Sequence, residues 1–166
     1  MNPQEFAELV PFLIAEKLED SSTPVPLVGG EIHESNPAWT FRTGPVLTLA
    51  LILPRSNELR LTCGLAIDVP YSAELFRFVN YLNHKQLVFG RAFLVDNLDP
   101  TIAAVLTQEI VYGDGVSWDY PPSIQNLLRI IGTLSGQASR LGPEIASRFQ
   151  AKPFSDADAA LLLGMG

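Results

Sequence analysis

The sequence predicts an α+β fold, in which helices pack on one antiparallel sheet. Segments with a two-residue apolar alternation follow one another across short turns marked by Gly and Pro, and strands joined by such turns must be antiparallel. Segments with apolar spacings of three and four residues stand before, between and after these strands. The expected order is helix, three strands, helix, two strands and helix (α-β-β-β-α-β-β-α), with the helices covering the sheet.

Length and composition fit one globular domain. The chain has 166 residues, of which 47% are hydrophobic and 17% charged, so it can bury a proper core and is not disordered in composition. We expect a single α+β domain over 1–153. The segment 154–166 is expected to be a flexible tail, although the apolar run Leu161–Leu163 could dock.

Charge and cysteine content narrow the class of protein. The net charge is −7, which argues against nucleic acid and against anionic lipid as partners, because both require clustered Lys and Arg. No signal peptide is evident, and the longest apolar run, Val46–Leu53, is too short to span a membrane, so we expect a cytoplasmic protein. The single cysteine, Cys63, lies in an alternating strand pattern and is expected to be a buried, inert thiol.

The first third of the chain has weaker signals. Pro3–Leu18 has a helical period, but Pro11 inside it predicts a kink or a helix that begins near Val10. Glu19–Pro26 reads as a polar loop, and Leu27–Glu34 is a weak strand candidate.

Three strands follow with clearer patterns. Trp39–Arg42 alternates aromatic and polar residues, and Val46–Leu53 is apolar throughout, as in a central strand covered on both faces. Leu59–Val69 alternates most regularly. One face carries Leu59, Leu61, Cys63, Leu65, Ile67 and Val69. The small or polar residues of the other face either leave room for something to approach the sheet or simply contact solvent.

The stretch from Leu75 to Asn97 is the organising element. Ser72 suits the N-cap of its helix, and Glu74 suits the first turn. The apolar face consists of Leu75, Phe78, Val79 and Leu82, whereas Arg77, Asn80 and His84 lie opposite. Phe76 and Tyr81 fall on the two shoulders of the apolar face, where they can meet a partner.

The chain then continues with two strands and a helix. Arg91–Asp96 and Ile102–Tyr112 read as strands, and the last helix is expected to start after Pro121-Pro122. Gly142-Pro143 predicts a kink or a break in this helix, with 144–149 continuing it.

The residue patterns of common catalytic and metal sites are not found. Glu31 and His33 share a strand face without a third ligand, and His84 stands alone on a helix face. Asp96, Asn97 and Asp99 lack calcium-loop spacing, and Gly113–Gly115 is not followed by the Lys of a phosphate loop. We therefore expect no catalytic residue, no metal ligand and no cofactor, and we expect that the protein is not an enzyme.

Two local motifs resemble a known family. The motifs are 79–83 (VNYLN) followed by 89–93 (FGRAF), and 141–145 (LGPEI) in the last helix. Together with the element order, they resemble the type III secretion chaperone-like fold, which includes the YbjN-like bacterial domains. The resemblance covers about Leu47 to Phe149. It implies a small, acidic, non-enzymatic protein, often a homodimer, that binds segments of other proteins or acts in regulation.

Aromatic residues are the candidate binding residues. Trp, Tyr and Phe are enriched in interfaces, and loops before helices display binding contacts. The residues expected at a partner or dimer interface are Trp39, Phe41, Phe76, Tyr81, Trp118 and Tyr120. The alternative for Trp39 and Trp118 is that they cap the edges of the core, and Phe76 and Tyr81 could also be core residues.

Two functions stay open at this point. The first is a chaperone-like or adaptor module that binds an extended or partly folded segment of a partner protein, through the sheet face or edge and the shoulders of the central helix. Its acidic charge would suit a basic partner. The alternative is a regulatory domain that senses a small ligand in a pocket between the sheet and the first or last helix, lined by Gly64, Ala66 and Ala104.

Overall fold

A computed structural model describes residues 25–26, 36–53, 58–87, 90–96, 101–111 and 121–163, with side chains in all of these ranges except 101–126. Its elements are β1 (Val25–Pro26), β2 (Ala38–Thr43), β3 (Val46–Leu53), β4 (Glu58–Pro70), α2 (Ala73–Tyr81), η1 (Leu82–Gln86), β5 (Arg91–Asp96), β6 (Thr101–Val111), α3 (Pro121–Arg148) and η2 (Asp156–Leu163). The strands form one antiparallel sheet in the order β1-β2-β3-β4-β6-β5. The protein is therefore α+β, with helices on an antiparallel sheet.

The strand predictions hold where the structure describes the chain, except that β1 is a short strand at the end of the predicted loop Glu19–Pro26. β2, β3, β4 and β5 cover the predicted strands, and β2 and β3 are joined by a tight turn in which Gly44 has a φ of +58°. A left-handed φ is tolerated best by glycine, which explains its place in this turn. The predicted helix Pro3–Leu18 and the predicted strand Leu27–Glu34 lie outside the described residues.

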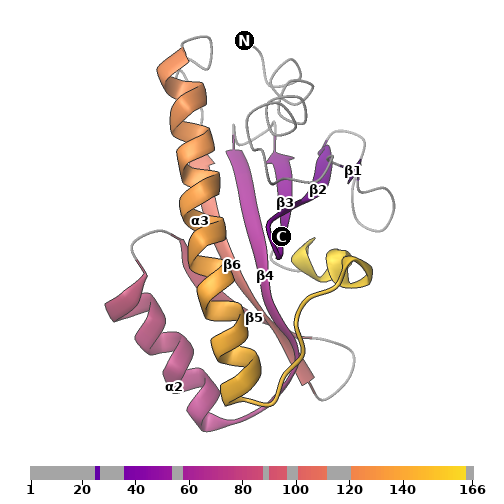
Figure 1. Cartoon of the computed structure of the whole chain (residues 1–166), viewed down its shortest axis with the longest axis vertical. Coiled ribbons are helices and arrows are strands. Elements are labelled where there is room, and N and C mark those ends of the chain that lie inside the picture. Colours follow the sequence, from indigo (N-terminus) through magenta and orange to yellow (C-terminus); the bar gives the residue numbers. More distant parts are fainter. Residues whose placement is uncertain are drawn as a thin grey trace.

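The sheet is apolar on both faces. On one face α2 and α3 cover a large core, which we call the helix-side core; Figure 1 shows α3 lying lengthwise over the sheet and α2 beside its lower end. The opposite face carries a smaller second core that includes Leu47, Leu49 and Leu51 of β3. Alternate residues of β3 therefore enter different cores, as expected for a strand covered on both faces.

A kink or a break was predicted at Gly142-Pro143; α3 continues through Pro143 to Arg148, so a break at this position is wrong. A proline inside a helix lacks the N–H that would bond the carbonyl four residues earlier, and its ring crowds both that carbonyl and the preceding residue. The preceding residue here is Gly142, which has no Cβ, so part of this crowding is absent. Gly142 also lies against β4, where a Cβ would come within 2.8 Å of the Leu65 carbonyl oxygen. Buried Leu141 and Ile145 hold both sides of the proline against the sheet.

β4 departs from the predicted alternation in its second half. The register against β6 shifts between Gly64 and Ala66 and again between Ala66 and Val69, and Asp68 has a φ of +55°. Such bulges insert an extra residue and turn the following side chains to the other face. Ala66 therefore joins the helix-side core, and Ile67 joins the second core, against the predicted alternation.

Residues 154–163, which were expected to belong to a flexible tail whose apolar run Leu161–Leu163 could dock, pack on the second face of the sheet. Figure 1 shows the chain turning at the lower end of α3 and running back beside the sheet to η2. Ile67 and Lys152 exchange two backbone hydrogen bonds, of 2.8 and 2.9 Å. Ala159 and Leu162 of η2 are buried in the second core. We call residues 150–163 the C-terminal strap.

Phe154 of the strap fills the space that Gly64 leaves on β4. A Cβ built on Gly64 would lie 2.4 Å from Cγ of the Phe154 ring, so the ring rests directly on the glycine backbone. Arg42 of β2 also binds the strap, because its Nε donates to the Asp156 carboxylate at 2.9 Å. Its Nη1 donates to the Pro45 carbonyl at 2.8 Å, in the turn between β2 and β3. The small-residue face predicted on this strand is thus covered by the chain itself.

Cys63 is buried, as predicted, and its Sγ lies 3.3 Å from the Thr48 hydroxyl. Burial disfavours the thiolate and raises the pKa of Cys63 to about 12, against a smaller opposing effect of the Thr48 hydrogen bond.

We expect Cys63 to resist a thiol reagent in the native protein at pH 8 and to react fully in denaturant. Because its pKa is higher in the folded than in the unfolded state, the unfolded chain loses its thiol proton first as pH rises. The part of the free energy of unfolding that depends on the Cys63 proton is therefore fully present below about pH 8.5, and it decreases as pH rises towards 12. Titration with the thiol reagent measures the reactivity of Cys63, and denaturation at several pH values measures the change in stability, with Cys63→Ala as the control for both. Rapid labelling of the native protein at pH 8 would contradict the burial of Cys63.

Candidate protein-binding surface

α2 forms where the sequence supplies a cap and an apolar stripe. Ser72 has an extended backbone, and its Oγ accepts a hydrogen bond from the Leu75 N–H at 3.1 Å. Leu75, Phe78 and Val79 are buried, and Leu82 continues the same stripe. This face attaches the helix to the sheet and leaves the opposite face of α2 exposed.

Three large aromatic side chains are exposed on and beside α2. Their exposed fractions are 49% for Tyr71, 50% for Phe76 and 50% for Tyr81. The rings of Tyr71 and Phe76 lie with their centroids 6.4 Å apart. We call these three residues the aromatic surface. The Tyr71 hydroxyl donates to the Asp96 carboxylate, which holds its ring beside β5 and raises the pKa of the phenol.

A π-type turn follows α2 and ties it to the sheet. Leu82–Gln86 form a π-helical turn, in which hydrogen bonds join residues five apart. The Leu87 N–H donates to the Leu82 carbonyl at 3.0 Å. Asn83 then points at β5: its Nδ2 donates to the Ala92 carbonyl at 2.9 Å, and its Oδ1 accepts from the Ala92 N–H at 2.7 Å. The Asn83 amide thus imitates one residue of a neighbouring strand.

The contact between Asn83 and Ala92 restricts the addition of a partner strand at the edge of the sheet. β5 is one of the two edge strands of the described sheet, and such edges commonly add a strand from a partner. Because the amide N–H and carbonyl of Ala92 are already bonded to Asn83, this outward position is occupied. Strand addition along the start of β5 would have to break both hydrogen bonds.

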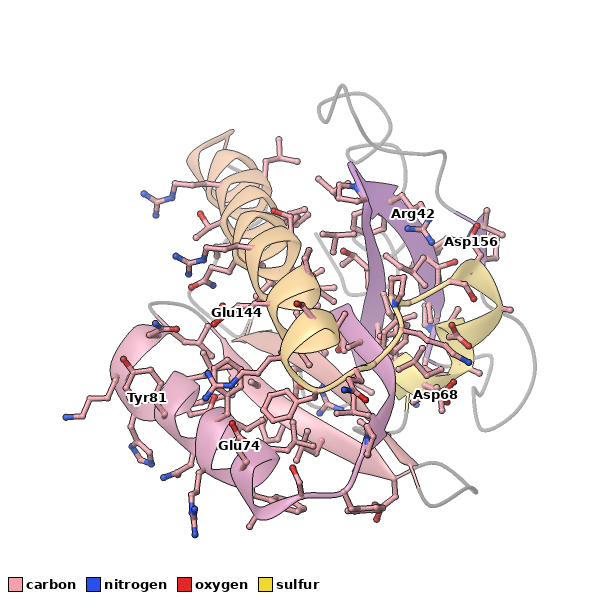
Figure 2. All side chains as sticks on the ribbon, turned by 60° about the horizontal axis from the view of Figure 1, so that its bottom comes forward. Arg42, Asp68, Glu74, Tyr81, Glu144 and Asp156 are labelled. Carbon is pink, nitrogen blue, oxygen red and sulfur yellow. The ribbon has the colours of Figure 1, made fainter. Side chains whose placement is uncertain are left out.

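A groove of about 420 Å³ runs between α2 and α3, with Phe78 among its lining residues. Figure 2 shows Glu74 and Tyr81 of α2 and Glu144 of α3 around this groove. The Arg148 guanidinium stacks over Phe78 at 4.6 Å and lies 3.4 Å from the Glu74 carboxylate. Aromatic and charged side chains therefore line the groove together on the side of α2 that carries Tyr81.

The structure places the six predicted interface residues in different environments. Phe76 and Tyr81 are half exposed, as their shoulder positions predicted. Phe41 is 2% exposed and belongs to the helix-side core, so its assignment to an interface is wrong. Trp39 is partly buried and packs on the same core, whereas Trp118 and Tyr120 lie outside the described residues.

Sequence reasoning missed three residues of this surface. Tyr71 precedes the helix and was not counted as part of it, although a residue just before an N-cap commonly packs on the first turn. Asn83 acts through Ala92, nine residues further on in β5, and Arg148 acts through Phe78 of another helix. The VNYLN motif contained Asn83, but spacing alone did not indicate its bond to β5.

The described residues contain no group of three or more His, Cys, Asp or Glu side chains placed to hold a metal ion. A second hollow, of about 360 Å³, lies between β4, the end of α3 and the strap. It is lined mainly by apolar and small residues, including Gly64, Ala138, Ala146 and Phe154. Such a hollow can admit an apolar molecule.

Comparison of the chain with known protein families found no matching family, and comparison with curated proteins found no significant match. Among the helices that the structure describes, none combines the length and apolar character needed to span a membrane.

Proposed function

We propose that this chain is a cytoplasmic, non-enzymatic protein-binding module of the chaperone or adaptor type, which binds a segment of a partner protein on the aromatic surface of α2. The observation that carries the proposal is the exposure of Phe76 and Tyr81 on the two shoulders of α2, with the exposed ring of Tyr71, just before the helix, beside that of Phe76. Aromatic side chains supply much of the energy of protein interfaces, and three half-exposed rings on and beside one short helix favour such a role.

The scaffold suits a preformed binding surface. Ser72 caps α2, its apolar stripe packs in the helix-side core, and Asn83 fixes its far end to β5. A helix held at both ends loses little conformational entropy when a partner binds, which improves affinity. The sheet face that we considered as a second binding site is covered by the strap, so the proposal rests on α2.

The proposal includes the family suggested by the sequence motifs. From β2 onwards the described elements run strand, strand, strand, helix, strand, strand, helix, which supports membership of the type III secretion chaperone-like, YbjN-like group. Asn83 of the VNYLN motif binds the backbone of Ala92 in the FGRAF motif, and this contact is a structural reason for the two motifs to occur together.

Capture from the native cell extract tests the function. Tagged wild-type protein, Phe76→Asp and Phe93→Asp are crosslinked briefly, and retained proteins are identified by mass spectrometry. Phe93 is a matched control, because it is an aromatic residue of 41% exposure on β5 rather than α2. We expect one stoichiometric partner with wild type and Phe93→Asp and its loss with Phe76→Asp. Equal retention by all three would contradict the proposed surface.

We also propose a homodimer that uses the aromatic surface. A carboxylate buried at an interface without a partner is costly, so Phe76→Asp should give a folded monomer. Light scattering measures the mass, and circular dichroism confirms that the variant is folded. A Phe76→Asp variant that stays dimeric would place the dimer interface elsewhere. If Phe76 were a core residue the variant would unfold instead, but its 50% exposure argues against this.

A second candidate function is small-ligand sensing, which the hollow of about 360 Å³ between β4, α3 and the strap favours. A ligand at a hundred times its dissociation constant adds about 2.7 kcal/mol to the free energy of unfolding. A thermal-shift screen of metabolites should then give a hit that Ala138→Leu abolishes by filling the hollow, with Gln137→Leu as the control outside it. A screen without any shift would exclude this second candidate.

A further inference from the structure

The helix layer carries positive charge in an acidic chain. α2, η1 and the part of α3 whose side chains are described hold five basic and two acidic residues, which leaves a charge of +3: Arg77, Lys85, Arg129, Arg140, Arg148, Glu74 and Glu144. The whole chain has a charge of −7, so the acidic excess lies elsewhere. A basic layer beside exposed aromatic rings favours an acidic partner, not the basic partner that the overall charge suggested.

Two of the basic residues line the groove between α2 and α3, together with the acidic residues Glu74 and Glu144. Arg77 comes from α2 and Arg148 from α3. Stacking of Arg148 over Phe78 at 4.6 Å fixes the direction of its guanidinium before any partner arrives. Within the described part of the chain, neither Arg77 nor Lys85 has an ion-pair partner. These cations are therefore available to carboxylates of another chain.

The backbone geometry indicates the form of the partner. Asn83 occupies the outward backbone groups of Ala92, which disfavours an added strand next to α2. A groove between two helices, with Phe78 in its lining and the half-exposed ring of Tyr81 beside it, instead suits the apolar face of a third helix.

We propose that the groove between α2 and α3 binds an acidic amphipathic helix of a partner protein, an inference that rests on the proposed function. Apolar side chains of the partner pack on Tyr81, and its carboxylates meet Arg77 and Arg148. Glu74 lies 3.4 Å from Arg148 and competes with the incoming carboxylates for it. Polyanions such as RNA fit less well, because the chain as a whole repels them and binding would need many more cations.

A designed peptide tests the inference on the full-length protein. The probe is a fluorescent 18-residue helical peptide with Leu on one face and Glu on the other, and its control carries Lys in place of Glu. We expect the Glu peptide to bind and the Lys peptide not to bind, with affinity that falls as salt rises. Arg77→Ala with Arg148→Ala, which removes both arginines that line the groove, should weaken binding of the Glu peptide about tenfold.

The matched control is Ala157→Glu with Ala160→Glu, which changes the net charge by the same amount at exposed positions of η2. This variant should bind the Glu peptide as wild type does. Equal effects of the two double variants would show a non-specific charge effect and overturn the inference. Tighter binding of the Lys peptide, or saturable binding of RNA or phosphatidylserine vesicles in place of the Glu peptide, would overturn it as well.

Glu74→Gln gives an effect in the opposite direction. Removing the competing carboxylate should tighten binding of the Glu peptide about threefold. Unchanged affinity would place Arg148 outside the site and contradict the inference. If the Glu peptide fails to bind while a native partner is still captured through Phe76, the acidic-helix inference fails and the proposed function stands. If capture through Phe76 fails too, the proposed function itself fails.

Discussion

Gly64→Ala is expected to lower the free energy of unfolding by about 2 kcal/mol in the wild-type chain, and to have no such cost in a chain that already carries Phe154→Ala. In the wild type the new methyl group would lie 2.4 Å from Cγ of the Phe154 ring, so the ring and the strap must move. With Phe154 truncated, the space is open, and alanine is then favoured over glycine in a strand by about 0.5–1 kcal/mol.

Phe154→Ala alone should cost about 3 kcal/mol, because a buried ring of the second core is removed. Urea denaturation of the wild type, the two single variants and the double variant measures the coupling between the residues. Gly132→Ala is a suitable control, since a Cβ at Gly132 meets nothing within 4 Å. Additive effects of Gly64→Ala and Phe154→Ala would contradict the docking of the strap on β4.

Asn83→Ala is expected to cost about 2 kcal/mol, because both hydrogen bonds to Ala92 are lost and the end of α2 is released from β5. Asn83→Asp separates the two bonds: a carboxylate still accepts from the Ala92 N–H but does not donate to the Ala92 carbonyl. Because one carboxylate oxygen then faces the Ala92 carbonyl oxygen, Asn83→Asp should cost at least as much as Asn83→Ala.

Hydrogen exchange locates the effect of Asn83. We expect faster exchange of the Ala92 amide and of the amides of α2 in Asn83→Ala, with the strap unchanged. Asn80→Ala, at an exposed position of the same helix, is the control and should be close to neutral. Uniform acceleration across the whole chain would mean that Asn83 supports global stability alone and does not position α2.

The sequence pattern predicted the strands and helices whose form depends on neighbouring residues in the sequence. The uniform apolar run of β3 indicated a strand covered on both faces, and Ser72 with the stripe of Leu75 and Phe78 indicated a capped amphipathic helix. The same helical period placed Phe76 and Tyr81 on the shoulders of α2, where both are half exposed.

Long-range contacts explain the failures. The reversal of Ala66 and Ile67 depends on the pairing of β4 with β6, which a strand alone does not reveal. The strap was expected to be loose because its fixing contacts, such as Phe154 on Gly64 and Arg42 with Asp156, join residues about a hundred positions apart. Phe41 alternates with polar neighbours like a half-exposed residue, but the helix layer covers it.

The candidate site was predictable only in part for the same reason. Its aromatic rings follow from the helical period, but the groove beside them requires Arg148 of α3 to reach Phe78 of α2. Likewise, the blocked edge of β5 requires Asn83 to reach Ala92 across the π-type turn.

Site-specific photo-crosslinking in living cells tests the central claim, that α2 presents a protein-binding surface. The photoreactive residue p-benzoylphenylalanine replaces Tyr81 in one variant and Phe93 in the other, and both positions tolerate a large exposed ring. We predict that the Tyr81 variant forms one major adduct with a protein, either a second copy of this chain or another partner, and that the Phe93 variant does not. Adducts from Phe93 alone, or none from Tyr81, would contradict the assignment of α2 as the binding surface.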